Sequence, residues 1–185
     1  MVKDDPAIVE AQIGRPLRAE SRVVSRCGLG LPVVVEVPPL LESGEPFPTR
    51  WWLTCPLAHR RIARLEAAGE VRAFDKRRRE DPDFAAAMEA THARYAAERD
   101  ELVPDDARLR PRGGVAGSRG GVKCLHAHFA DQRAIAAGAT EGSNPVGAET
   151  AAAVEPLNCA FPCVTERDGV AVRSPEWVEP ELPES

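Results

Sequence analysis

The chain has 185 residues, a net charge of −5 and a hydrophobic content of 43%, which suits one domain whose core needs no metal in order to fold. The acidic balance argues against general nucleic-acid binding, whose footprint is a basic surplus. No stretch approaches the roughly 18 apolar residues of a membrane span, and the N-terminus shows no apolar signal core, so we expect a cytoplasmic protein.

The N-terminal third predicts one short helix and three strands. Residues 5–14 open with Asp-Pro, which places proline at the first helical position, and close with glycine. Residues 22–25 and 33–37 are short β-branched segments that predict a hairpin with Cys27 at its bend. Residues 50–54 predict a third strand, which ends at a Cys-Pro pair.

Helices dominate the rest of the chain. One is expected over residues 57–68, before a glycine, and a second Asp-Pro pair opens a longer helix over residues 81–99. Residues 122–137 again show a helical pattern that stops at a glycine, and residues 148–154 predict a short helix. A last strand is expected over residues 170–172.

These elements predict a single α+β domain over residues 1–173. Its small antiparallel sheet comes from the N-terminal third and is packed by three or four helices. Residues 174–185 are rich in proline and glutamate, so we expect a disordered acidic tail there.

The five cysteines are the strongest chemical signal. In a reducing compartment such a set is more often metal-binding or catalytic than disulfide-bonded. Most lie beside proline or glycine, where a bend holds the sulfur and leaves amides free to donate to it, as iron–sulfur clusters require. The positions are Cys27, Cys55, Cys124, Cys159 and Cys163.

We hypothesise that folding brings several of these residues to one centre, either zinc in a tetrahedron of thiolates or an iron–sulfur cluster. If residues 122–137 are helical, Cys124 and His128 share a face; in a strand, His126 would join them. The expected ligands are Cys27, Cys55 and Cys124 with Cys163 or His128 as the fourth, and Cys159 is a further candidate.

Two other interpretations of the cysteines stay open. Buried thiols often serve as small apolar side chains without any ligand. A reactive thiol is the second alternative, for example Cys124 activated by His128, although neither an orienting third group nor oxyanion donors are evident. His59 and His92 lie in amphipathic helical patterns and are expected at the surface.

A loop rich in glycine and arginine, residues 110–123, runs directly into a predicted helix. Backbone N–H groups at a helix start bind anions, and Arg112, Arg119 and Lys123 could add charge, so the loop is a candidate phosphate site. It is not a Walker A loop, because the Gly-Lys-Ser/Thr ending is missing. The alternative is a flexible, solvated loop. The basic run over residues 76–80 is expected on an exposed helix face.

Several of these segments together resemble a bacterial family, the domain of unknown function numbered five hundred and one. The resemblance extends over roughly residues 6–165 and implies no established activity. Its members are similar to proteins encoded beside a septum-formation initiator and an exopolyphosphatase-like enzyme. The resembling segments are residues 8–16, 27–32, 46–49, 52–56, 121–128 and 144–147.

The leading hypothesis from the sequence is therefore an uncharacterised metal-binding protein. One alternative is a module or enzyme for phosphate, polyphosphate or another phosphorylated ligand at residues 110–123. A second alternative, implied by the resemblance alone, is an interaction partner of cell-division proteins.

Overall fold

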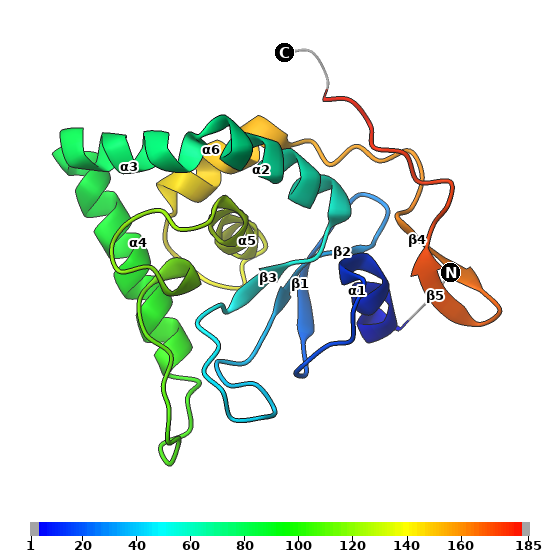
Figure 1. Cartoon of the computed structure of the whole chain (residues 1–185), viewed down its shortest axis with the longest axis horizontal. Coiled ribbons are helices and arrows are strands. Elements are labelled where there is room, and N and C mark those ends of the chain that lie inside the picture. The colour runs from blue at the N-terminus through cyan, green and yellow to red at the C-terminus, as the bar shows by residue number, and fades with distance from the viewer. Residues whose placement is uncertain (1–3, 183–185) are drawn as a thin grey trace.

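The computed structural model describes residues 4–182 and confirms the predicted α+β class (Figure 1). The helices are α1 (Asp5–Ile13), α2 (Pro56–Ala68), α3 (Glu70–Glu80), α4 (Pro82–Asp100), α5 (Leu125–Ala136) and α6 (Pro145–Val154), with a 3-10 turn η1 (Val115–Gly117). The strands are β1 (Arg22–Arg26), β2 (Pro32–Glu36), β3 (Trp51–Leu53), β4 (Val164–Arg167) and β5 (Val170–Arg173).

The main sheet is antiparallel with the strand order β1-β2-β3. A tight bend joins β1 to β2, where the Cys27 N–H donates to the Leu31 carbonyl over 3.0 Å. Successive side chains of a strand point to opposite faces. Val34 therefore packs in the main core with α5, whereas Val35 packs with Val9 of α1. The sheet lies between these two helices.

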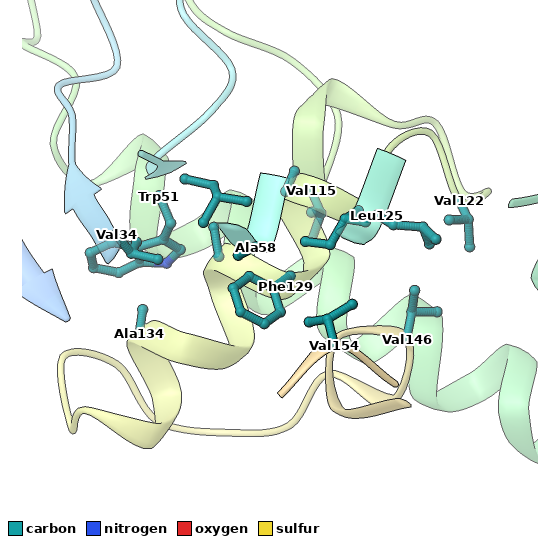
Figure 2. Packing of buried hydrophobic residues seen from close by; sticks show 14 of the residues in the cluster. Val34, Trp51, Ala58, Val115, Val122, Leu125, Phe129, Ala134, Val146 and Val154 are labelled. Atoms are coloured by element: carbon teal, nitrogen blue, oxygen red, sulfur yellow. The ribbon is translucent and has the colours of Figure 1, made fainter. Parts of the chain in front are cut away.

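Helix α5 is the centre of the core (Figure 2). Its residues Leu125, Phe129 and Ala134 are fully buried. They pack against Trp51 of the sheet and Val146 of α6, among others. Burying a side chain such as that of Phe129 stabilises the fold by about 2–3 kcal/mol. The position of α5 is therefore strongly determined, and so is that of the loop that leads into it.

Helices α2, α3 and α4 follow one another around α5 (Figure 1). Gly69, with φ of 99°, ends α2 and starts α3 in the same step. The Asp81 side chain accepts a hydrogen bond from the Phe84 N–H at 3.0 Å and caps α4, as the Asp-Pro pair predicts. Within residues 4–182, no helix combines the length and apolar character that crossing a bilayer requires.

After β5, the described chain continues to residue 182 without a further helix or strand. A hairpin of β4 and β5 packs against α1, and the chain then runs back along α2. The carboxylate of Glu179 lies 2.5 Å from Arg64, and Arg60 covers the ring of Trp177. One aromatic ring and one carboxylate thus fasten the segment to the arginines of α2 as far as residue 182; residues 183–185 lie outside the described part of the chain.

Candidate metal sites

Three potential metal ligands converge between α2 and α5. The Nδ1 atom of His126 lies 3.2 Å from Oε1 of Glu66 and 3.7 Å from Sγ of Cys124. The three ligand atoms all lie within 4.8 Å of one another, and the three residues are half-buried, which leaves them accessible to an ion from solvent. We refer to Glu66, Cys124 and His126 as the Glu–Cys–His cluster.

The start of α5 positions this cluster. Cys124 is extended, with φ of −158° and ψ of 119°, and directly precedes the helix. The Leu125 N–H donates to Oε1 of Glu66 over 2.7 Å, so a carboxylate from the end of α2 caps α5. Negative charge is favourable at a helix N-terminus. The same oxygen therefore both holds the helix start and faces the imidazole of His126.

The contacts of His126 restrict how its protons are placed. Its Nε2 lies 3.2 Å from the carbonyl oxygen of His59, which can only accept, so Nε2 carries a proton. In the neutral imidazole, Nδ1 then presents a lone pair toward Cys124 and Glu66. In the protonated imidazole, Nδ1–H donates to Glu66. A cation or a proton at the same place therefore satisfies the cluster.

A neighbouring ring and partial burial define the surroundings of the cluster. The ring of His59 packs on the ring of His126, with centroids 4.2 Å apart. Partial burial lowers the pKa of His59, and the neighbouring His126 lowers it further. Burial raises the pKa of the Cys124 thiol, although the N–H groups of Ala127 and His126 act in the opposite direction. A bound cation would favour the thiolate, as the deprotonation of ligands by metals requires.

The other four cysteines line one narrow cavity of about 10 Å³, which we call the thiol cavity. Cys27 comes from the bend between β1 and β2, and Cys55 immediately precedes α2. Cys159 and Cys163 come from the segment between α6 and β4. Leu57 and Trp177 are among the apolar residues that close the cavity.

The thiols of this cavity differ in burial. Cys55 and Cys163 are buried, whereas Cys27 and Cys159 are half-buried. Burial raises the pKa of Cys55 to about 12, against the opposing influence of the Ala58 and Leu57 N–H groups. Burial also raises the pKa of Cys163, and the donor from Gln12 opposes this shift. In the absence of further positive charge, these two thiols are neutral at pH 7.

The structure therefore divides the ligand set expected from the sequence. It brings Cys27, Cys55 and Cys163 around one cavity and adds Cys159. Cys124 lies in the other cluster. The expected pairing of Cys124 with His128 is replaced by pairing with His126, because α5 begins at Leu125 and the extended backbone at Cys124 turns its sulfur toward residue i+2.

His128 has a structural environment instead. It is fully buried, and its Nδ1 donates to Oδ1 of Asn144 over 3.0 Å. Asn144 also donates to the buried Asp131 at 2.8 Å, which is paired with Arg94 at 2.6 Å. Burial lowers the pKa of His128 to about 4. The Asn-Pro-Val-Gly segment singled out in the sequence thus ties α6 to α5.

His92 also differs from its expected place at the surface. Only 7% of it is exposed, and its Nδ1 accepts a hydrogen bond from the Val115 N–H at 3.1 Å. The ring therefore anchors the loop that precedes α5.

Backbone N–H groups at the end of the glycine–arginine loop and at the start of α5 donate to carboxylates of the protein. The Val122 N–H donates to Asp75 over 2.9 Å, and three residues later the Leu125 N–H donates to Glu66. Arg112, Arg119 and Lys123 are all exposed. Two carboxylates thus lie where an anion would approach the helix start. Phosphate binding by this loop stays a prediction, as do partners in cell division.

Comparison with known proteins gives a family without a stated activity. A family model described as "Protein of unknown function (DUF501)" matches residues 23–152. No curated protein and no solved structure matches the chain significantly. The matched segment contains the whole Glu–Cys–His cluster and ends before Cys159.

Proposed function

The chain belongs to the DUF501 family, and we propose that it is a metal-binding protein that holds zinc through Glu66, Cys124 and His126. The observation that carries the proposal is the convergence of a carboxylate oxygen, a thiol sulfur and an imidazole nitrogen within 4.8 Å of one another. Glu66 lies in α2, His126 lies in α5 and Cys124 directly precedes α5, so the packing of the two helices in the core positions the ligand atoms before any ion binds.

The chemistry of the three ligands favours zinc. Zinc accepts cysteine sulfur, histidine nitrogen and carboxylate oxygen in tetrahedral sites, and three protein ligands leave a fourth position for water or another small ligand. Magnesium and calcium prefer oxygen ligands, so a thiolate disfavours them. An iron–sulfur cluster is held by several cysteines, and this cluster of residues has one thiol.

A cysteine nucleophile is the competing use of the same side chains. In that arrangement the thiol contacts one imidazole nitrogen and the orienting group contacts the other. Here the sulfur of Cys124 and the carboxylate of Glu66 both face Nδ1 of His126, while Nε2 faces a backbone carbonyl. Convergence on one nitrogen suits a shared cation better than a proton relay.

Zinc titration of the reduced, metal-free protein in competition with a chromogenic chelator tests the proposal. We expect Cys124→Ser and His126→Ala each to lose one equivalent of zinc. Glu89→Gln, which alters an exposed carboxylate on α4 outside both the cluster and the thiol cavity, is the control and keeps that equivalent. Wild-type protein that binds no zinc, or variants that bind as much as the wild type, would refute the proposal.

A further inference from the structure

Four cysteines from three separate parts of the chain surround the thiol cavity, and three of their sulfurs have N–H groups close by. Gln12 Nε2 donates to Sγ of Cys163 at 3.5 Å, and Trp177 Nε1 donates to Sγ of Cys159 at 3.4 Å. Cys55 directly precedes α2, and the N–H groups of Ala58 and Leu57 act to lower the pKa of its thiol against the larger effect of burial. Hydrogen bonds from N–H groups stabilise a thiolate more than a thiol, because the thiolate is the stronger acceptor.

Among residues 4–182, the buried cation next to the cavity has no carboxylate among its hydrogen-bond partners. Arg61 is only 3% exposed. Within the described residues, each of its hydrogen-bond acceptors is a neutral oxygen. They are the carbonyl oxygens of Val154, Pro156, Pro180 and Glu181 and the side-chain oxygen of Asn158.

The charge of Arg61 makes negative charge in the cavity more favourable. Burying an unpaired charge is costly, so an anionic neighbour is stabilising. Burial lowers the pKa of Arg61, whereas Glu179 and the thiols of Cys159 and Cys55 act in the opposite direction. Glu179 is already paired with Arg64 and Arg60. The thiols are therefore the neighbouring groups still available to supply the anion.

We propose that the thiol cavity is a second metal site, in which the thiolates of Cys27, Cys55, Cys159 and Cys163 hold one zinc-class ion. Of the four negative charges, the ion would offset two and Arg61 one. This site shares no ligand with the Glu–Cys–His cluster and does not depend on it.

The dimensions of the cavity favour a single ion over a cluster of several metals. Its volume of about 10 Å³ is close to that of one water-sized sphere. Sulfurs bonded to zinc at about 2.3 Å in a tetrahedron are about 3.8 Å apart. The sulfurs here are more widely spaced, since no three of them lie within 4.8 Å of one another in the described chain. Binding would therefore draw Cys27 and Cys159 inward, which their places in irregular segments permit.

Cobalt titration of the full chain distinguishes the two sites, because thiolate-to-cobalt charge-transfer absorption grows with the number of thiolate ligands. We expect two equivalents in the wild type. Cys124→Ser should lose one equivalent and keep the strong tetrathiolate absorption. The double variant Cys27→Ser/Cys159→Ser should lose that absorption and keep one equivalent. These outcomes make failure of this proposal distinct from failure of the proposed function.

Alkylation of the native wild-type protein provides a test that needs no variant. With excess chelator, the alkylating reagent should modify Cys27 and Cys159, because both thiols are only half-buried. Added zinc should slow the alkylation of both at least about tenfold, since a thiolate bound to zinc is protected from the reagent. The proposal is overturned by labelling that zinc leaves unchanged, by disulfides among these cysteines in freshly purified protein, or by the brown colour of an iron–sulfur cluster.

Discussion

Glu66 and Leu125 are joined by a 2.7 Å hydrogen bond from the backbone N–H of Leu125 to Oε1 of Glu66, which links the end of α2 to the start of α5. The carboxylate therefore has two roles, as a helix cap and as a member of the Glu–Cys–His cluster. A substitution that keeps the oxygen and removes the charge separates these roles.

Glu66→Gln should weaken zinc binding while preserving the fold. The amide oxygen of glutamine can still accept from the Leu125 N–H, but a neutral amide is a poor zinc ligand. We expect the zinc Kd to rise by at least about tenfold with little change in the melting temperature of the metal-free protein. Chelator competition and thermal unfolding measure the two effects. Glu89→Gln, at an exposed position on α4, is the control, and an equal rise in Kd there would contradict the assignment.

Stability should fall as the pH drops below 6.5, because His128 is buried in its neutral form. Its pKa is about 4 in the folded chain and about 6.5 when unfolded. The unfolded chain thus binds more protons between these values, so the stabilisation is complete above pH 6.5 and decreases toward pH 4. His92, whose pKa burial also lowers, adds in the same direction.

Urea unfolding at pH 7.5 and pH 5 measures this effect. We expect His128 to account for a loss of about 2 kcal/mol over that interval. Burial raises the pKa of Asp131, so the folded chain binds its proton more readily than the unfolded chain. Protonation of Asp131 therefore offsets part of the loss in the pH range where this carboxyl titrates. His128→Asn places an amide donor near Oδ1 of Asn144 and should flatten the pH dependence. If the variant and the wild type lose stability in parallel, His128 is not the responsible group.

Tyr95→Phe should destabilise the protein by about 1–3 kcal/mol. The Tyr95 hydroxyl is buried and accepts hydrogen bonds from the N–H groups of Arg50 at 2.6 Å and Trp51 at 3.4 Å. Phenylalanine fills the same space but leaves these amides at the start of β3 without their acceptor. Chemical denaturation gives the difference in unfolding free energy, and an unchanged value would show that water replaces the hydroxyl.

Gly147→Ala should destabilise the packing of α6 on α5 by about 1–3 kcal/mol, as overpacking does. A Cβ atom at this position would overlap the carbonyl oxygen of His128 and lie 2.8 Å from Cβ of Gln132. Gly28→Ala is the matched control, because a Cβ there has no neighbour within 4 Å. In thermal unfolding, Gly147→Ala should have a clearly lower melting temperature than Gly28→Ala. Equal melting temperatures would contradict the close packing of α5 against residue 147.

Much of the fold was predictable because the residues that begin and end its helices and strands are easily recognised in the sequence. Asp-Pro pairs, terminal glycines and β-branched strands indicated α1, α4 and the β1–β2 hairpin, although the cap of α1 is Asp4 and not the Asp5 of the Asp-Pro pair. Helix α3 was incompletely predicted: its composition is strongly charged, Phe74 is its one buried residue, and Gly69 was interpreted only as a stop. In the structure, that glycine turns the chain directly into the next helix.

The ligand groups were harder to predict for a physical reason. Glu66 and Leu125 are 59 positions apart, and only the packing of α2 against α5 brings the carboxylate to Cys124 and His126. The helical pattern from residue 122 favoured His128 as a partner of Cys124. Asp75 instead binds the N–H of Val122, and the helix starts three residues later. Long-range packing thus decided which histidine lies beside the thiol.

The family match ends at residue 152, before Cys159, Cys163 and the segment after β5 that Trp177 and Glu179 hold against α2. Cys159 and Cys163 supply two of the four thiols of the cavity, and the indole of Trp177 donates to the sulfur of Cys159. An ion held by these thiols would fix the position of Cys159 and with it the contact to Trp177, so metal supply would govern how firmly the segment after β5 is held, while the Glu–Cys–His cluster would bind its own ion independently.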